Sequence, residues 1–343
     1  MTAKHFITSG LAALAVAITL GLWLLCGHAD FEIAPPPRIT DHIVPAGANQ
    51  LAGTLVLPTD IATPPIALIV HGDGPQDRWS ADTYLPLVNT LLDAGIGVFS
   101  WDKPGIGQST GHWLDQSMAD RTAEATAALA YLRDNQGIAP KRLGYLGFSQ
   151  AGWVMPTARV QADAAFTVLI GPAINWRIQG AYYTAKRLQQ QGLPPLQIDQ
   201  RVAAELAQND RIFAGDRTRP ANMPQDRFAF VRKNYDVDAT ADIAAMTTPT
   251  LVLLGADDLN VNPVNSARIY LGHLPENPAH QVQIIPNATH GLLRSGPYNY
   301  QLPSEWSGLS QLRFLAAGRR AFAPGALDLL TTWILAQTGG APG

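Results

Sequence analysis

The chain has 343 residues, of which 47% are hydrophobic and 15% are charged, so it is long enough to bury a sizeable core in one large α/β domain or two smaller ones. Its 24 basic and 27 acidic side chains give a formal net charge of −3, which provides no basic surface for nucleic acid, and no nucleic-acid partner is expected. The single cysteine excludes a disulfide framework and a cysteine-based zinc site, and none of the eight histidines lies in an HExxH sequence.

The amino-terminal residues differ in composition from the rest of the chain. No charged side chain occurs from residue 6 to residue 29, and an apolar run extends from Leu11 to Cys26 behind a cationic start. This arrangement is typical of a secretory signal peptide, although the run also approaches the roughly 20 residues that span a bilayer. We therefore predict that residues 1–29 are either a signal peptide or a retained anchor, with residues 6–26 in the membrane. In both cases the body is exported to the periplasm, the medium or the outer face of the inner membrane.

The remainder of the chain reads as strands that alternate with helices. Residues 30–38 include three consecutive prolines and are predicted to form a stiff spacer. Strands are predicted over 39–44, 51–57, 66–70, 96–101, 143–148, 165–170, 251–254 and 282–285, and helices over 84–94, 117–135, 151–161 and 326–336. The alternation stops at about 172–246, where the pattern indicates a helical insertion. The prediction is one doubly wound, mostly parallel α/β sheet over 39–343 with a helical cap.

A candidate nucleophile follows the fifth predicted strand, in the sequence Gly147-Phe148-Ser149-Gln150-Ala151-Gly152. A serine hydroxyl is a poor nucleophile unless a sharp turn presents it beside a base, and such a turn needs small residues two positions before and after the serine. Gly147 and Ala151 meet that requirement. The alternative is that Ser149 only caps the following helix, because serine is a common N-cap residue.

Candidates for an acid and a base follow two later strands, in the order Ser, Asp, His that this architecture requires. Asp257 and Asp258 come after the seventh predicted strand, and His290 comes after the last one. Because the carboxyl ends of parallel strands meet at one edge of the sheet, these side chains should converge on the serine. His273 and His280 precede the last strand and are expected at the opposite end of the sheet.

These residues belong to motifs that together resemble the α/β-hydrolase superfamily, and more narrowly its serine-aminopeptidase-type (S33-like) esterases and acyl hydrolases. The motifs are HGDGPQDR (71–78), WDKPGIGQSTG (101–111), GFSQAGW (147–153), GADDLNV (255–261) and NATH (287–290). The resemblance implies a triad of Ser149, Asp258 and His290, with Asp257 as the alternative acid. Asp258 would fix the tautomer of His290, and His290 would accept the proton of Ser149 as a general base.

An oxyanion hole for such a serine needs two backbone N–H groups. One is expected from Gln150, the residue after the nucleophile. The resemblance to the HGxG sequence of the family assigns the other to Asp73, with Gly74 as the alternative. His71 is expected to hold this loop through hydrogen bonds and not to take part in the reaction.

Three more side chains are candidates for substrate binding. The resemblance places Arg78 near the mouth of the site, where it could bind a substrate carboxylate. The alternative is an internal ion pair with Asp77 that braces the loop. Trp176 and Tyr182 begin the predicted cap and could line an apolar pocket, or they could belong to the core of the cap itself.

The prediction is thus a serine hydrolase that cleaves carboxylic esters through an acyl-enzyme intermediate, with no metal and no organic cofactor. Its substrate would be a small-molecule ester or a short acyl or peptidyl compound. An aminopeptidase or amidase with the same triad is the alternative, and its acidic ammonium-binding residues would come from Glu205, Asp210 and Asp216. A non-catalytic binding module on the same fold is a third hypothesis, which the presence of a complete triad disfavours. The motifs leave the acyl length and the oligomeric state open.

Overall fold

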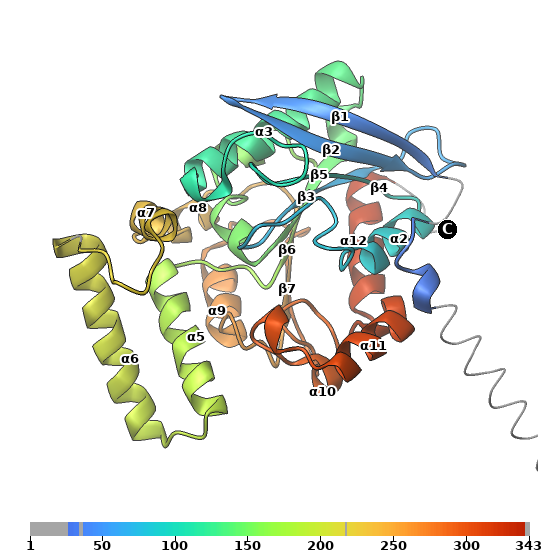
Figure 1. Cartoon of the computed structure of the whole chain (residues 1–343). Helices are drawn as coiled ribbons and strands as arrows, with labels where there is room; N and C mark the ends of the chain where they lie inside the picture. Colours follow the sequence, from blue (N-terminus) through green and yellow to red (C-terminus); the bar gives the residue numbers. More distant parts are fainter. Residues whose placement is uncertain (1–26, 34–36, 217, 340–343) are drawn as a thin grey trace, which may run out of the picture.

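The computed structural model describes residues 27–33, 37–216 and 218–339, with an eight-stranded sheet in the order β1-β2-β4-β3-β5-β6-β7-β8 at its centre (Figure 1). The strands are β1 (Arg38–Ala46), β2 (Asn49–Leu57), β3 (Ile66–Val70), β4 (Gly97–Trp101), β5 (Leu143–Phe148), β6 (Thr167–Ile170), β7 (Thr250–Gly255) and β8 (Gln281–Ile285). The β1–β2 and β2–β4 pairs are antiparallel, and the remaining pairs are parallel. The predicted mostly parallel α/β sheet is confirmed.

The central strands bury both of their faces, which explains their continuous apolar sequences. In β3, Ile66, Leu68 and Val70 belong to one hydrophobic core. Ala67 and Ile69 of the same strand belong to a second core. This alternation follows from the two-residue period of a strand, so the sheet separates the two cores of the molecule.

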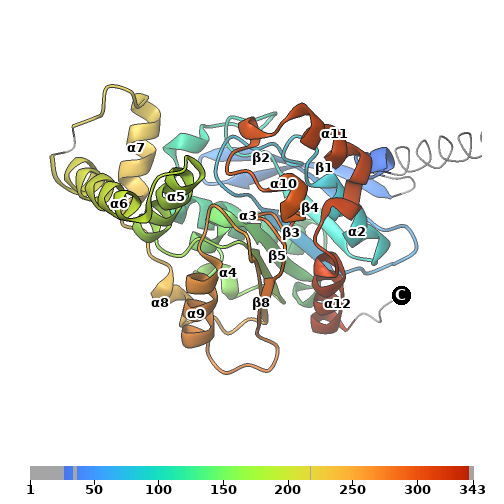
Figure 2. The same cartoon turned by 90° about the horizontal axis from the view of Figure 1, so that it is seen from below.

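Helices cover both faces of the sheet (Figure 2). They are α2 (Leu85–Asp93), α3 (Met118–Asn135), α9 (Pro263–His273) and α12 (Ala326–Thr338), and the short 3₁₀-helices η1 (Trp113–Asp115) and η2 (Pro140–Arg142) flank α3. The first core packs against α3 and α9, and the second against α2 and α12. Helix α3 begins with a capping box between Ser117 and Asp120, which exchange side-chain to backbone hydrogen bonds. The capping box fixes the first turn of α3, which carries one side chain of the site described below.

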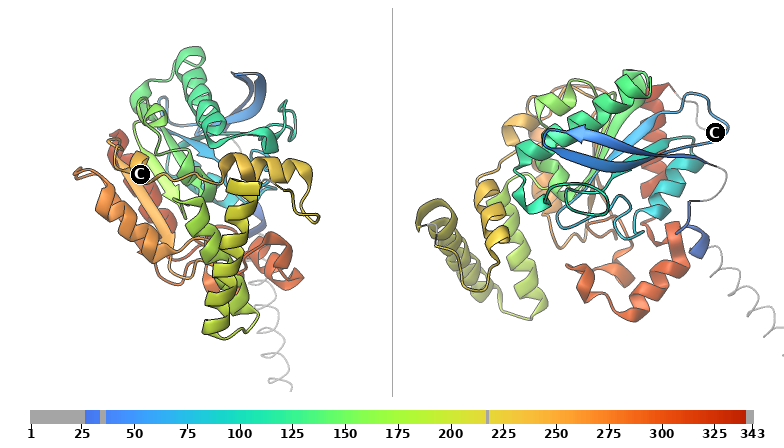
Figure 3. Two further views of the ribbon diagram at one scale, coloured as in Figure 1. Left: turned by 90° about the vertical axis from the view of Figure 1, so that its left-hand side faces the viewer. Right: turned by 45° about the horizontal axis from the view of Figure 1, so that its top comes forward.

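The insertion between β6 and β7 forms a group of helices at one side of the sheet (Figures 1 and 3). Its elements are α5 (Trp176–Gln190), α6 (Pro195–Asn209), the π-helix η4 (Asp210–Asp216), α7 (Gln225–Asn234) and α8 (Thr240–Ile243). The ring of Phe213 lies 5.6 Å from that of Phe228 and 5.1 Å from that of Tyr235. These aromatic residues belong to the first hydrophobic core, so the insertion packs onto the body of the molecule.

One predicted helix is wrong. The sequence pattern predicts a helix over 151–161, but the chain forms the short 3₁₀-helix η3 (Ser149–Trp153) and then the single turn α4 (Ala158–Gln161). Pro156 lies between them, and a proline inside a helix removes a hydrogen bond and clashes with the preceding turn. Ser149 is therefore followed by a tight turn and not by a long helix.

A second group of short helices lies between β8 and α12 (Figure 2). Its elements are α10 (Ser295–Tyr298), η5 (Pro303–Glu305), α11 (Gly308–Ala317) and η6 (Gly318–Ala321). Residues 30–33 of the predicted spacer pack against this group, because Asp30 accepts a hydrogen bond of 2.8 Å from the Arg319 guanidinium. The predicted membrane segment, residues 6–26, lies outside the described residues. Within the described ranges, no helix is both long enough and apolar enough to cross a bilayer.

Candidate active site

Ser149 lies on a sharp turn directly after β5, with a positive φ of 52°. This left-handed conformation costs a non-glycine residue about 1–3 kcal/mol, so the surrounding structure must hold it in place. The turn is possible because its neighbours are small. A Cβ added to Gly147 would clash with Met155 and Ala151, and one added to Gly152 would clash with the backbone at the end of β6. The predicted requirement for small residues on both sides of the serine thus has a direct steric cause here.

Asp258 and His290 form a hydrogen-bonded pair at the carboxyl ends of β7 and β8. The Asp258 Oδ2 atom lies 2.7 Å from His290 Nδ1, and the Asp258 side chain is fully buried. Its other oxygen accepts hydrogen bonds from the N–H groups of Asn260 (2.7 Å) and Val261 (2.9 Å). Asp257, the alternative acid, is exposed and accepts a hydrogen bond from Ser295 instead. The structure thus pairs Asp258, and not Asp257, with the imidazole.

The pKa of His290 results from opposing effects. Burial by itself would lower this pKa, but the charge of Asp258 and the hydrogen bond to its carboxylate outweigh burial and raise the pKa above its ordinary value. The same hydrogen bond places the proton of the neutral imidazole on Nδ1, because a carboxylate can only accept. Nε2 is then left as the basic nitrogen.

Ser149 and His290 line one cavity of about 890 Å³. Gly171, at the end of β6, allows the imidazole to approach, since an added Cβ there would lie 2.8 Å from His290 Nδ1. No hydrogen bond joins the Ser149 hydroxyl to His290 in the described structure. Such bonds are often long in an empty site and shorten when substrate binds.

The two other histidines near β8 lie away from this cavity. The Thr250 N–H, at the start of β7, donates to His280 Nδ1 at 3.2 Å, and His273 bonds the Ile269 carbonyl within α9. Thr250 is the first residue of β7, so His280 lies at the amino ends of the parallel strands. Ser149, Asp258 and His290 follow the carboxyl ends, at the other side of the sheet.

The loop after β3 passes directly beside Ser149, because an added Cβ on Gly72 would lie 3.4 Å from the Ser149 Cβ. The amino group of the buried Lys103 donates to the carbonyls of Gly72 (2.6 Å) and Gly74 (2.9 Å). In a trans peptide the N–H points away from the C=O. Lys103 thus orients the peptide that carries the Asp73 N–H. Among the backbone contacts of the described residues, the Asp73 N–H has no acceptor. It could therefore donate to an oxyanion.

The second predicted oxyanion donor, Gln150, is held by its own side chain. The Gln150 amide accepts from the Arg121 guanidinium and donates to the Asp73 carboxylate at 3.1 Å. Arg121 also donates to the His71 carbonyl at 2.5 Å. One buried arginine therefore connects both loops that carry the candidate N–H groups. The prediction missed Arg121, although its position on an otherwise apolar stripe of α3 with Ala125 was a signal of a buried charge.

His71 supports the loop as predicted from the sequence, since its Nε2 lies 2.6 Å from the Trp101 carbonyl oxygen. Burial, together with the nearby Lys103 charge, lowers the pKa of His71 to about 3. His71 is thus neutral at any pH at which the protein would work.

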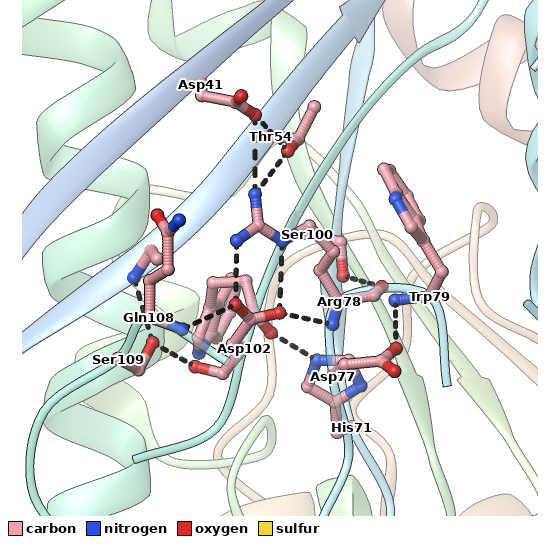
Figure 4. Close-up of polar contacts among 12 residues, drawn as sticks. Asp41, Thr54, His71, Asp77, Arg78, Trp79, Ser100, Asp102, Gln108 and Ser109 are labelled. Atoms are coloured by element: carbon pink, nitrogen blue, oxygen red, sulfur yellow. Dashed lines mark hydrogen bonds and ion pairs between the residues drawn. The ribbon is translucent and has the colours of Figure 1, made fainter. Parts of the chain in front are cut away.

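Arg78 does not face the cavity. Its guanidinium donates to both carboxylate oxygens of Asp102, at 3.0 and 2.7 Å, and to the Thr54 hydroxyl at 2.6 Å (Figure 4). Asp77, the partner considered from the sequence, accepts instead from the N–H groups of Trp79 and Ala81. Arg78 therefore braces the loop against β2 and β4, and Asp102 is the residue that pairs with it.

Of the two cap aromatics, only Trp176 reaches the cavity. It stacks on Trp153 with ring centroids 4.7 Å apart, and both rings line the wall. Tyr182 points elsewhere and donates to the Asp258 backbone carbonyl at 2.7 Å, so it ties the cap to the loop that carries the acid. Tyr183, a third aromatic at the start of the predicted cap, also lines the cavity, whereas the prediction missed Gln179, Arg227, Gln301 and Leu302.

Arg227 of α7 places a cation at the cavity wall, as was considered for Arg78 from the sequence. Its guanidinium lies 3.2 Å from the Asp73 carboxylate, and both side chains remain partly exposed at the cavity wall. The charge of Arg227 lowers the pKa of Asp73, although burial acts in the opposite direction. In the described chain, no group of three His, Cys, Asp or Glu side chains gathers in a way that would hold a metal ion.

The sheet order and the serine on a strand-to-helix turn define an α/β-hydrolase fold. The family model described as "Serine aminopeptidase, S33" matches residues 65–295. This match spans more than half of the chain, so the protein belongs to that family and is a hydrolase of the α/β-hydrolase superfamily.

Solved structures share the fold at low sequence identity. An esterase from Pyrococcus furiosus is 18% identical with a TM-score of 0.51, over 83% of this chain and 92% of that chain. An esterase from Butyrivibrio proteoclasticus with bound ferulic acid is 15% identical with a TM-score of 0.51, over 85% and 96%. A proline iminopeptidase from Mycobacterium smegmatis is 17% identical with a TM-score of 0.52, over 87% and 99%. A search of curated proteins found no match.

Proposed function

We propose that the protein is an exported serine esterase that hydrolyses carboxylic esters through an acyl-enzyme at Ser149. One observation carries the proposal. Ser149 is held at a positive φ on the wall of a cavity that it shares with His290, and the Nδ1 of that imidazole is bonded to a buried carboxylate. A serine in this setting can lose its proton at neutral pH.

In the proposed reaction, Ser149 Oγ attacks the ester carbonyl carbon while His290 Nε2 accepts the hydroxyl proton. The N–H groups of Asp73 and Gln150 stabilise the oxyanion. His290 then gives the proton to the departing alcohol, which leaves an acyl-serine. A water molecule, deprotonated by the same imidazole, attacks this acyl group and restores the free serine.

The three acidic cap residues considered for binding a free amino terminus do not support the aminopeptidase alternative. The Glu205 carboxylate accepts from Thr184 and pairs with Arg187, and Asp210 pairs with Arg177. Neither Glu205 nor Asp210 lines the cavity, and the Asp216 side chain lies outside the described part of the chain. The acidic residues considered for binding an ammonium group are thus committed elsewhere or not described.

A fluorophosphonate probe followed by mass spectrometry tests the proposal. The adduct is expected on Ser149, and Ser149→Ala is expected to lower kcat for short p-nitrophenyl esters by at least about 10³-fold. The thermal transition should hardly change, since alanine adopts the same backbone conformation at similar cost. His280→Ala serves as the control histidine variant and should retain activity.

Two results would contradict the proposal. Turnover retained in Ser149→Ala would remove the nucleophile, and faster cleavage of aminoacyl anilides than of esters would favour the aminopeptidase. Fractionation of cells that express the full chain tests the export part, which a purely cytosolic pool would contradict.

A further inference from the structure

Helix α11 presents an apolar face to solvent. Leu309, Leu312 and Leu315 are 57%, 59% and 45% exposed. They are spaced by three residues and so lie along one side of the helix, whereas Phe314 and Ala317 pack inward. We call Leu309, Leu312 and Leu315 the leucine face. A helix that buries one side and exposes leucines on another is suited to bind a second apolar surface.

The first described residues of the chain pack on α11. A Cβ added to Gly27 would overlap the Ala316 carbonyl, and Ala316, four residues after Leu312, is itself buried. Further contacts hold this segment in place. Asp30 pairs with Arg319, and the ring of Phe31 lies 5.1 Å from that of Phe314.

The uncharged sequence of residues 6–26 therefore joins the body beside the leucine face. This sequence contains the apolar run that either directs export or remains in the membrane. If it remains in the membrane, its junction at Gly27 brings α11 to the lipid surface. Arg313 lies four residues after Leu309, next to the leucines, and is exposed. A cation at the edge of an apolar face is suited to lipid phosphates.

The buried side of helix α11 also packs against the segment that lines the cavity. Leu302 and Pro303 line the cavity, and Leu302 is 45% exposed. Trp306 connects this stretch to α11, because its ring lies 5.6 Å from those of Phe314 and Tyr298. The entrance and helix α11 thus belong to one packed unit.

We propose that the leucine face lies on the surface of a phospholipid bilayer, with residues 6–26 retained as the anchor beside it. This arrangement seats the entrance of the cavity next to lipid, and the substrates are amphiphilic esters that partition into the membrane. The statement about substrates rests on the proposed esterase function, whereas the contact between α11 and lipid does not.

A fluorescent label tests the contact. The full chain carries one cysteine, Cys26, so a Cys26→Ser background accepts an environment-sensitive NBD label at Leu312→Cys. Leu271→Cys on α9 is the matched control, since Leu271 is 70% exposed. In liposomes of phosphatidylethanolamine and phosphatidylglycerol, the label at residue 312 should shift to the blue and be quenched by nitroxide-bearing lipids, and the label at 271 should not.

Three results would overturn the contact. One is that the nitroxide lipids quench the labels at residues 312 and 271 equally, or quench neither label. Another is a blue shift at residue 312 that depends on the ratio of protein to lipid, which would indicate a second copy of the chain. The third is a mature chain in the soluble fraction that begins at Asp30, which would show that the apolar segment is removed.

A variant that introduces two negative charges tests the substrate class. Leu309→Glu with Leu312→Glu should lower turnover of a long-chain ester dissolved in the liposomes by about tenfold or more, and leave turnover of soluble p-nitrophenyl acetate unchanged. Equal turnover of the liposomal ester would refute the substrate class. If neither ester is cleaved even by the unmodified chain, the esterase proposal fails while the label still reports on the contact.

Discussion

The two walls of the cavity are built differently. One wall, formed by loops at the carboxyl ends of the strands and called the sheet-borne wall, holds Ser149, the Asp258–His290 pair and the loop after β3. Asp258 and Lys103, which hold these groups in place, are only 1% and 2% exposed. The other wall, formed by the helices of the insertion and called the cap-borne wall, contains Arg227. The side chain of its partner Asp73 is 46% exposed. The comparison teaches that the groups that position Ser149 and His290 are fixed by burial, whereas the groups that would contact the rest of a substrate are partly exposed.

Two arginine–aspartate pairs, one behind the cavity and one at its wall, repeat this contrast. Arg78 and Asp102 have side chains that are 17% and 4% exposed, and Arg227 and Asp73 have side chains that are 35% and 46% exposed. Removing one partner of a buried pair leaves the other charge without compensation, at a cost of about 3–5 kcal/mol, whereas an exposed pair contributes about 0–1 kcal/mol. The Arg78–Asp102 ion pair therefore supports the fold, whereas the Arg227–Asp73 ion pair remains accessible to a ligand.

The largest expected effect comes from Asp258 in the sheet-borne wall. Asp258→Asn should lower kcat by about 10⁴-fold, because an amide no longer selects the tautomer that leaves Nε2 basic. Steady-state kinetics with a soluble ester checks this, and Asp257→Asn is the matched control that should stay near the activity of the unmodified protein. Equal losses in both variants would contradict the assignment of the acid.

The same variant changes the pH dependence. Only the neutral imidazole can accept a proton, so kcat/KM should fall as the pH drops below the pKa of His290, which Asp258 raises above its ordinary value. In Asp258→Asn that raising charge is gone, and the acid limb of the residual activity should move to lower pH. A limb that stays in place or moves to higher pH would show that Asp258 does not control the imidazole.

An intermediate effect is expected from Lys103. Lys103→Met removes the amino group that orients the Gly72–Asp73 peptide, so kcat should fall by about 10²-fold, close to the loss of one oxyanion donor. Burst titration with a fluorophosphonate counts the folded sites, which separates a lower rate per site from partial unfolding. An unchanged kcat per folded site would show that the loop keeps its conformation without the lysine.

The smallest effect is expected in the cap-borne wall. Arg227→Gln should leave the thermal transition nearly unchanged and alter KM for esters with an acidic acyl group by a few-fold, since its ion pair is partly exposed. Arg78→Gln is the opposite case and should lower the free energy of unfolding by about 3–5 kcal/mol. If Arg227→Gln destabilised the protein as much as Arg78→Gln, the contrast between the two walls would not hold.

Much of the fold could be predicted because it depends on local patterns. The apolar runs of β3, β5 and β7 indicate strands buried on both faces, and small residues around Ser149 indicate a sharp turn. The helix over 151–161 was predicted wrongly because apolar periodicity outweighed the effect of Pro156. Proline is also a local signal, since it disfavours a continuous helix, and here Pro156 separates η3 from α4.

The sequence by itself determined which residues stand at the ends of the strands, and therefore that Ser149, Asp258 and His290 lie at one edge of the sheet. This follows from the short-range geometry of parallel strands, in which chain order sets the position of each loop. Apart from His71 and Trp176, which the sequence indicated, the tertiary structure decided which side chains support and line the cavity. Arg121 and Arg227 come from two separate elements, and the direction of each side chain depends on packing partners far away in the sequence.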